Sequence, residues 1–134
     1  MRKTKIVTSF LRNSEKILLL KRSEKVKSMK NLWAGISGII EDNEKPIKRA
    51  KIEILEEVGI EESDITLMKE GNKILIESPQ YVNHQWEVYP FLFSCSNKEI
   101  KLNWENSDSR WISINELNNF TTVPSLDRVL ARLF

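Results

Sequence analysis

Hydrophobic residues recur with helical spacing in one stretch of this chain, between Pro46 and Gly59. At 100° per residue, four apolar positions of this stretch fall on a single stripe. These positions are Ile47, Ala50, Ile54 and Val58. Proline in the first turn and glycine just past the last turn are residues that commonly begin and end a helix. The pattern therefore predicts an amphipathic helix that starts near Pro46 and stops at Gly59.

Most other apolar runs are short and are separated by turn residues, which predicts strands. The predicted strands cover residues 6–11, 17–20, 65–68, 73–76, 82–93, 100–102 and 110–112. Polar residues at 13–15 indicate a hairpin between the first two strands, and Gly71–Asn72 predicts a turn between the third and fourth. Pro90 predicts a bulge or an edge within the long run, because proline has no backbone N–H to donate.

Two further helical signals lie near the end of the chain. Ser113 with Glu116 predicts a capping box for a short helix, and Pro124 opens a last helix with four apolar residues on one stripe. The stripe consists of Leu126, Val129, Leu130 and Leu133. Because strands and helices alternate without regular β-α-β units, their order predicts an α/β fold with a mixed sheet between helices. The length of 134 residues predicts a single domain, 1–134.

Composition narrows the class of protein. Apolar residues make up 40% of the chain and charged residues 30%, which is typical of a soluble globular protein. The net charge of +2 is too small for a dedicated nucleic-acid-binding protein, so no nucleic-acid partner is expected. No apolar run approaches membrane-spanning length, and Arg12 interrupts the amino-terminal stretch too early for a signal peptide. A single cysteine, Cys95, fits a reducing compartment, and we expect a cytoplasmic protein without a membrane partner.

Three glutamates share one face of the predicted helix and make it electrostatically unfavourable. Glu53, Glu56 and Glu57 are spaced i, i+3 and i+4, where like charges disfavour a helix by a few tenths of a kcal/mol, on the order of 0.3. Two of them also lie in the last turn, where the helix dipole favours cations. A divalent cation bound by oxygen ligands would remove both objections. The alternative is an exposed helix face filled with good helix formers.

The spacing around these glutamates matches a known signature. It consists of a glycine, five residues, a glutamate, seven residues, and then Arg-Glu-apolar-any-Glu-Glu-any-Gly-apolar. The matching residues are Gly38, Glu44, Glu53, Ile54, Glu56, Glu57, Gly59 and Ile60. This stretch resembles the Nudix box of the Nudix hydrolases, with Ile52 in place of the usual arginine. From average residue usage, a match with one mismatch in a chain of this length has a chance probability on the order of 10⁻⁵.

Segments outside the box are also similar to the Nudix family, so that the resemblance covers nearly the whole chain. They are Leu18–Arg22, Leu32–Trp33, Trp104–Glu105, Arg110–Trp111 and Glu116–Leu117. Other segments resemble Nudix-like domains that are joined to relatives of the translation initiation factor 2B alpha subunit. These segments are VTSFLRN, PFLF, LNWE and VPSLDRVL.

The resemblance implies a Nudix-type α/β/α sandwich with a mixed β-sheet, and a pyrophosphohydrolase activity. The substrate would be a nucleoside diphosphate linked to another moiety, and the cofactor Mg²⁺ or Mn²⁺. By resemblance, Glu53, Glu56 and Glu57 are metal ligands, the backbone oxygen of Gly38 is a further ligand, and one of the glutamates is the catalytic base. Glu105, outside the box, is another candidate for the base, and its alternative is an exposed loop glutamate. Family members often form dimers, so a homodimer is an expectation.

Two arginines are candidates for substrate binding. Arg22 ends a predicted strand next to the site that the box would build, and the lysine-rich loop after it is either a solvated surface or an electropositive rim. Arg49 lies one turn before Glu53 and projects between Glu53 and Glu56. We hypothesise that Arg49 braces the glutamates where the family arginine is missing, while Ile52 joins Leu55 in a second apolar stripe.

Three functions remain open at this stage. The first is a metal-dependent diphosphate hydrolase, which the motif favours. The second is a Nudix-fold nucleotide-binding or regulatory module without turnover, which Ile52 and the relatives joined to other domains favour. The third is an isopentenyl-diphosphate isomerase-like enzyme, a family that shares the fold. This chain has Ser37 and no cysteine in the corresponding loop.

Overall fold

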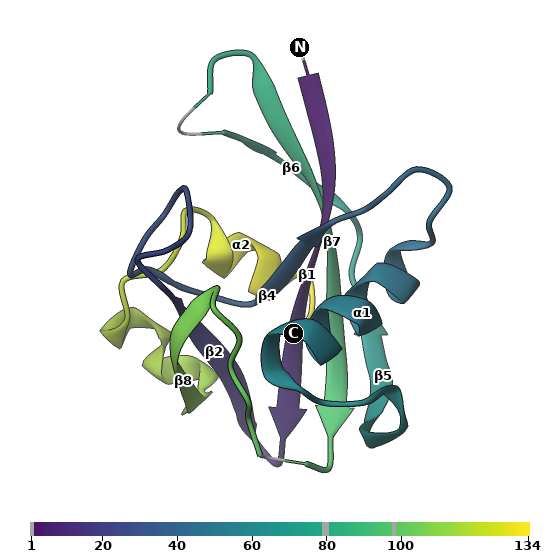
Figure 1. Cartoon of the computed structure of the whole chain (residues 1–134), viewed down its shortest axis with the longest axis vertical. Coiled ribbons are helices and arrows are strands. Elements are labelled where there is room, and N and C mark those ends of the chain that lie inside the picture. Colours follow the sequence, from purple (N-terminus) through teal and green to yellow (C-terminus); the bar gives the residue numbers. More distant parts are fainter. Residues whose placement is uncertain (1, 79–80, 98) are drawn as a thin grey trace.

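The computed structural model describes residues 2–78, 81–97 and 99–134, which form a mixed sheet with helices on both faces (Figure 1). The strands are β1 (Arg2–Asn13), β2 (Lys16–Arg22), β3 (Trp33–Ala34), β4 (Ile36–Ile39), β5 (Ile65–Glu70), β6 (Ile74–Glu77), β7 (His84–Cys95) and β8 (Asn106–Ser113). The helices are α1 (Pro46–Val58) and α2 (Leu126–Ala131), with 3₁₀ turns η1 (Glu62–Asp64) and η2 (Ile114–Asn119). The architecture is the expected α/β/α sandwich.

The long strands β1 and β7 form the centre of the sheet and run parallel to each other. On the other edge of β1, its middle residues, Ile6 to Ser9, pair with β4, and its last residues turn into β2. Ser14 makes this turn with a φ of 55°. The predicted hairpin is therefore confirmed. β4 was not predicted as a strand, because its sequence of small and apolar residues has no clear alternation.

Alternate residues of β1 and β7 point to opposite faces of the sheet and build two separate cores. Val7, Phe91 and Phe93 pack under α1, whereas Phe10 and Leu92 pack under α2. The apolar stripe of each helix lies where the sequence predicts it. In α1 the residues Ala50, Ile54 and Val58 are fully buried. The four stripe residues near the end of the chain are also buried, but α2 begins at Leu126 instead of Pro124, and Leu133 lies beyond its last residue. A buried aliphatic side chain of this size contributes about 2 kcal/mol of hydrophobic stabilisation.

Helix α1 ends as its sequence predicts. Gly59 adopts the left-handed conformation with a φ of 72°, and its N–H donates to the carbonyl of Leu55 at 3.0 Å. Glycine accepts this conformation without the steric penalty that a Cβ atom would bring. The helix therefore ends at Val58, and the chain continues through Gly59 into η1.

Strands β5 and β6 differ from the prediction, because no reversal occurs at Gly71–Asn72. Both strands pair antiparallel with β7, one after the other along its length. Pro90 lies at the junction, between the last β5 pair at Phe91 and the first β6 pair at Val88. Its carbonyl accepts the N–H of Gly71 at 3.0 Å, and it has no N–H to return. β7 itself continues through Pro90 in register with β1, so the predicted bulge or edge is wrong for β7, and the interruption lies between its neighbours β5 and β6 instead.

Near the end of the chain, one predicted strand is absent from the described structure and one predicted capping box is present. Ile100 and Leu102 lie in irregular backbone rather than in a strand, although both pack against the core under α1. The capping box of Ser113 and Glu116 is present, and it opens a 3₁₀ helix. Among the described residues, no helix is both long and apolar enough to cross a bilayer.

A buried carboxylate on β7 ties β6 to the centre of the sheet. Glu87 accepts a hydrogen bond from the Tyr89 hydroxyl at 2.9 Å and lies 3.3 Å from the Lys73 ammonium and 4.0 Å from that of Lys5. Burial by itself raises the pKa of Glu87, but these three partners together lower the pKa below its usual value. The charged form of Glu87 is therefore favoured in the folded state.

We expect Glu87→Gln to flatten the acid dependence of stability. A carboxyl whose pKa is lower in the folded state stabilises the protein above its unfolded value of 4.5, and that contribution is lost as the pH falls through the folded value. The free energy of unfolding of the wild-type protein, from urea melts between about pH 6 and pH 3, should fall more steeply than that of the variant. Parallel pH profiles would show that Glu87 is not stabilised by its partners.

Candidate active site

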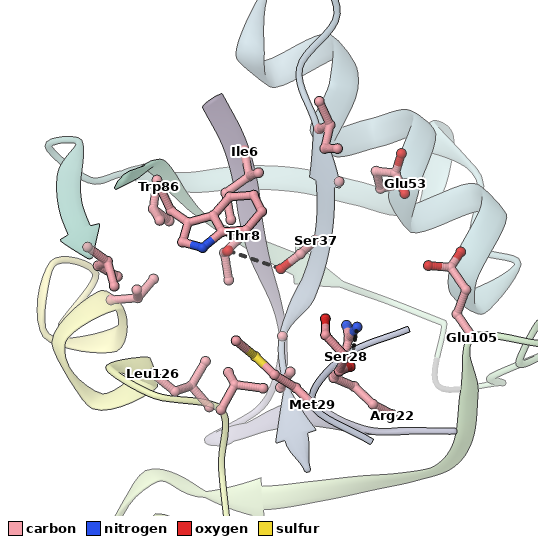
Figure 2. A pocket seen from close by; sticks show the side chains of 18 of the residues that line it. Ile6, Thr8, Arg22, Ser28, Met29, Ser37, Glu53, Trp86, Glu105 and Leu126 are labelled. Carbon is pink, nitrogen blue, oxygen red and sulfur yellow. Dashed lines mark hydrogen bonds between the residues drawn. The ribbon is translucent and has the colours of Figure 1, made fainter. Parts of the chain in front are cut away.

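A cavity of about 560 Å³ opens between α1, β4, and the loops that follow β2 and precede β8 (Figure 2). Four glutamates line it: Glu41, Glu53, Glu56 and Glu105. They come from three parts of the chain: the loop before α1, α1 itself, and the loop before β8. Gly38, Arg22 and Arg49 also line the cavity. The fold thus gathers the residues that the sequence singles out, apart from Glu57, which lies beneath the others.

The glutamates of α1 differ in burial. Glu56 is exposed, whereas Glu53 and Glu57 are buried with 8% and 4% of their surface accessible. The alternative of a solvated glutamate face is therefore wrong for Glu53 and Glu57. One carboxylate oxygen of Glu57 accepts a hydrogen bond from the Asn106 side chain at 3.1 Å. Its other oxygen, Oε2, is buried without a hydrogen-bond partner among the described residues.

This burial makes ionisation of the two carboxyls unfavourable. Burial, repulsion by Glu105 and the proximity of Glu53 raise the pKa of Glu57 well above its ordinary value, against the hydrogen bond from Asn106. Burial, followed by repulsion from Glu56 and Glu105, raises the pKa of Glu53, and the bond from Arg49 offsets part of this. An uncompensated buried carboxylate is costly, so the pair favours a positive charge beside it.

Gly38 on β4 lets α1 approach the sheet at this point. A Cβ atom at position 38 would collide with the carboxylate of Glu53. The sequence suggests close backbone approach in this small-residue segment, and the structure shows that the approaching group is a glutamate side chain. Ser37, the preceding residue, instead forms a hydroxyl pair with Thr8 across the strands, at 3.0 Å.

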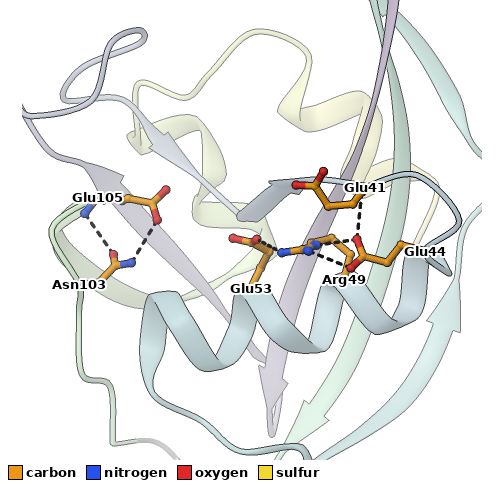
Figure 3. Close-up of polar contacts among 6 residues, drawn as sticks. All are labelled: Glu41, Glu44, Arg49, Glu53, Asn103 and Glu105. Carbon is orange, nitrogen blue, oxygen red and sulfur yellow. Dashed lines mark hydrogen bonds and ion pairs between the residues drawn. The ribbon is translucent and has the colours of Figure 1, made fainter.

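Arg49 occupies the centre of an ionic network on α1 (Figure 3). Its Nε and Nη2 atoms donate to the two carboxylate oxygens of Glu44, both at 2.8 Å, and its Nη1 atom donates to Glu53 at 3.0 Å. Glu44 also accepts the backbone N–H of Glu41 at 3.0 Å. The bond to Arg49, together with that N–H, lowers the pKa of Glu44. The planar guanidinium of Arg49 makes a bidentate contact with Glu44, which fixes the arginine. The fixed arginine in turn holds Glu53 in one orientation.

Arg49 contacts a different pair of glutamates from the pair predicted. The helical wheel places Arg49 between Glu53 and Glu56, but within the described residues it bonds to Glu53 and Glu44 and not to Glu56. Its side chain runs back toward the start of the helix, as long helical side chains usually do. The second apolar stripe also differs from expectation, because Leu55 is half exposed and Ile52 is partly buried beside it.

The loops on the other side of the cavity are held by backbone contacts. The guanidinium of Arg22 donates twice to the carbonyl of Ser28, at 3.1 and 3.2 Å, and this fixes the loop after β2. Ser23 donates through its backbone to Glu105 and through its hydroxyl to Trp104, at 2.8 and 2.7 Å. The side chain of Glu105 accepts a bond from Asn103 at 3.1 Å (Figure 3). Glu105 is thus held in the cavity, as the resemblance implies for an acidic residue at that point.

Sequence reasoning missed Asn106 and assigned no function to His84. Asn106 follows Glu105 directly and carries no motif of its own, so only the fold shows that it contacts Glu57. His84 bonds through its ring to Thr4 at 2.7 Å and to Arg2 at 3.5 Å, away from the carboxylates. A structural role for this histidine agrees with the absence of a partner cluster in the sequence.

The donor set at this site fits a divalent cation. Carboxylate oxygens are the ligands that Mg²⁺ and Mn²⁺ prefer, and the unpartnered Oε2 atom of Glu57 is a buried oxygen in need of a partner. In the parts of the chain described, no three acidic, histidine or cysteine side chains are already gathered closely enough to hold a metal ion. The site therefore has the chemistry for a cation and not the closed geometry of a structural metal centre.

The fold and the site together define the class of protein. A model of the NUDIX domain family matches residues 2–133. The chain therefore belongs to the NUDIX family and is a Nudix-type hydrolase, the class of enzyme that acts on phosphoric anhydrides. No curated protein sequence matches the chain significantly.

Solved structures share the fold at low sequence identity. A MutT protein from Methanosarcina mazei Go1 is 22% identical, with a TM-score of 0.74, and the match covers 95% of this chain and 88% of that one. An Ap4A hydrolase from C. elegans is 16% identical, with a TM-score of 0.75 and coverages of 99% and 95%. A MutT NUDIX hydrolase from Burkholderia pseudomallei is 18% identical, with a TM-score of 0.77 over the full length of both chains. At these identities the similarity establishes the fold alone.

We expect Arg49→Ala to reduce kcat at least about tenfold with a smaller change in KM, because Glu53 loses the group that orients it. Adding Ile52→Arg, which restores the family residue, should recover part of the loss. Recovery should be incomplete, since Ile52 is partly buried and a guanidinium there has to find partners. Steady-state kinetics of the single and double variants provide the measurement.

Lys48→Ala is the matched control, since it also removes a cation from α1 but no bond to a carboxylate of the network. It should leave kcat nearly unchanged. If Arg49→Ala retained the wild-type kcat, Arg49 would have no part in orienting Glu53.

Proposed function

We propose that this protein catalyses the metal-dependent hydrolysis of a diphosphate bond in a nucleoside diphosphate linked to another moiety. The observation that carries this proposal is the buried pair of Glu53 and Glu57, with the unpartnered Oε2 atom of Glu57, beside a cavity lined by further glutamates. A divalent cation would offset the charge of these carboxylates. A bound Mg²⁺ or Mn²⁺ would neutralise phosphate charge and polarise the anhydride.

In this proposal the residues of α1 hold the cation and those of the opposite loop act on water. Glu53, Glu56 and Glu57 supply carboxylate oxygens, and the Gly38 carbonyl is the candidate for a further ligand. Arg49 is a positioning residue, because its bonds go to Glu44 and Glu53. Because the charge of Arg49 is already paired in the folded protein, we assign the positioning of Glu53 as its main role and substrate binding as a secondary role.

Glu105 is the group that we propose as the general base. It lines the same cavity as Glu53 and Glu56 but comes from a different segment, and its negative charge raises the pKa of Glu53 and of Glu57. Glu105 would take a proton from a water molecule as the water oxygen bonds to phosphorus. The phosphoanhydride P–O bond then breaks, and the two phosphate products leave with the bridging oxygen on one of them. Arg22, at the cavity wall, is the candidate for a contact with substrate phosphate.

The structure bears on the two alternative functions. The missing family arginine favours a module without turnover, but Arg49 supplies a guanidinium to Glu53 from one turn earlier. An isomerase-like function needs a reactive thiol, and the position in question holds Ser37, whose hydroxyl is paired with Thr8. Cys95, the single cysteine of the chain, is buried in the core under α1. Hydrolysis is therefore the function that the site supports best.

Phosphate release from a panel of nucleoside diphosphate derivatives, with Mg²⁺ present and products identified by mass, tests the activity. Glu53→Gln and Glu57→Gln should each lower turnover by at least about a hundredfold, because they remove oxygen ligands for the cation. The metal-free Glu57→Gln protein should melt at a higher temperature than the wild type, since a neutral amide replaces a buried carboxyl with an unpartnered oxygen. Glu15→Gln, at the exposed β1–β2 turn, is the control. Near-normal turnover in both site variants would refute the assignment.

Millimolar Mg²⁺ or Mn²⁺ should raise the melting temperature of the wild-type protein, because only the folded helix brings the carboxylates together. The same additions should raise that of Glu57→Gln by clearly less. Thermal melts with and without metal, with Ca²⁺-free buffer and a chelator as reference, give the comparison. A wild-type melting temperature that does not respond to either metal would contradict the site.

A further inference from the structure

The carboxylate of Glu57 is held by the protein at one of its two oxygens. Its Oε1 atom accepts a buried hydrogen bond from the side-chain Nδ2 atom of Asn106 at 3.1 Å. Its Oε2 atom is buried and has no hydrogen-bond partner among the described residues. Asn106 is buried as well. Because one held oxygen fixes the rotation of a carboxylate, the bond from Asn106 also fixes the position of the open oxygen.

The backbone around Asn106 holds this donor in place. Asn106 begins β8 and lies opposite Arg22 of β2, next to an irregularity in the pairing of the two strands. Its N–H donates to the carbonyl of Asn103 at 3.4 Å, which closes the turn that leads into β8. The amide that reaches Glu57 is therefore anchored in the sheet and not in the helix that it contacts.

The same turn carries Glu105, the proposed general base. The side chain of Asn103 accepts the N–H of Glu105 and donates to its carboxylate, both at 3.1 Å (Figure 3). Hydrogen bonds attach this segment to α1 at two points. One runs from the N–H of Lys101 to the carbonyl of the last residue of α1 at 2.9 Å, and the other is the bond from Asn106 to Glu57. Asn106 is thus the attachment that lies next to Glu105 in the chain.

The amide of Asn106 differs in charge from the guanidinium that contacts Glu53. Arg49 brings a positive charge to its partner, whereas Asn106 brings a neutral donor. A neutral donor orients a carboxylate and leaves its negative charge for a metal ion. A positively charged partner at Glu57 would compete with the metal ion for the same charge.

We propose that Asn106 is a positioning residue that leaves the Oε2 atom of Glu57 to the cation and holds the segment of Glu105 against the metal site. The inference rests on the proposed function, because the proposed cation gives the open oxygen its role. Loss of a hydrogen-bond partner of a metal ligand typically costs roughly ten- to hundredfold in metal affinity or activity. Loss of the Asn106 amide should therefore weaken metal binding and slow turnover.

Binding of Mn²⁺ to the metal-free protein tests the orientation of Glu57 without turnover. Asn106→Leu keeps a side chain of similar size and removes the donor, and calorimetry should give a Kd for Mn²⁺ at least about tenfold higher than that of the wild type. In the Glu57→Gln background the same substitution should change the Kd less than about twofold, because the carboxylate through which Asn106 acts is gone. Asn106→Gln, which keeps an amide, should bind Mn²⁺ more tightly than Asn106→Leu.

NMR spectra of the wild-type protein give a readout that needs no variant. The side-chain amide signals of Asn106 should shift when Mg²⁺ is added, because the carboxylate that accepts from this amide gains a new partner. The signals of Asn13 should not, since its amide donates to the carbonyl of Cys95 at 2.6 Å and it does not line the cavity. Asn13→Leu is therefore the matched control, because it also removes an asparagine hydrogen bond. It should bind Mn²⁺ as the wild type does.

Steady-state kinetics at saturating Mg²⁺ test the hold on Glu105. The kcat of Asn106→Leu should stay at least about tenfold below that of the wild type, with KM nearly unchanged, because added metal does not restore the attachment of the segment to α1. The kcat of Asn13→Leu should equal that of the wild type.

The outcomes separate this inference from the proposed function. An unchanged Kd for Mn²⁺ in folded Asn106→Leu, an equal loss of affinity in the Glu57→Gln background, or Asn106 amide signals that do not respond to Mg²⁺ would each overturn the orientation of Glu57 by Asn106. Full recovery of kcat at saturating Mg²⁺ would overturn the hold on Glu105. Failure of the wild-type protein to bind Mn²⁺ at all would instead contradict the carboxylate site of the proposed function.

Discussion

The structure depends on the burial of two acidic side chains between a helix and a sheet. Glu53 and Glu57 lie where α1 packs on β4, and the missing side chain of Gly38 leaves the space for one of them. Burial of this kind is unfavourable unless the charge is compensated, and compensation comes in part from Arg49 and Asn106. The rest of the compensation would come from the proposed divalent cation. The helix thus folds with a buried carboxyl oxygen, Oε2 of Glu57, that has no hydrogen-bond partner among the described residues.

Local sequence patterns predicted the helices and the acidic site well. The α1 stripe, its ends at Pro46 and Gly59, and the buried positions Leu126, Val129 and Leu130 of α2 all follow from residue spacing, because helix packing is governed by periodicity along one element. The resemblance to the Nudix box brought in Glu105 and Gly38, which lie in the cavity. The contact of Arg49 with Glu53 agrees with the bracing hypothesis, although its other partner is Glu44 and not Glu56.

Features that depend on contacts far apart in the chain were not predictable. The sequence shows a turn at Gly71–Asn72, but whether two strands pair with each other or with a third depends on which edge is free. β4 was missed because its burial comes from β1 and α1. Asn106 was missed because its contact with Glu57 spans 49 positions.

The break at Pro90 divides the outer part of the sheet into two independent lengths. β5 lies beside the half of β7 that supports α1, and β6 lies beside the half that begins at His84, where Ile76 lines the active-site cavity. Since the two lengths share a neighbour but no hydrogen bonds with each other across the break, a substitution in β6 has no direct route to the seat of α1. A substitution at Ile76 therefore changes the wall of the cavity without altering the strand pairing beside the seat of α1. The interruption between β5 and β6 thus separates the part of the sheet that lines the cavity from the part that supports α1.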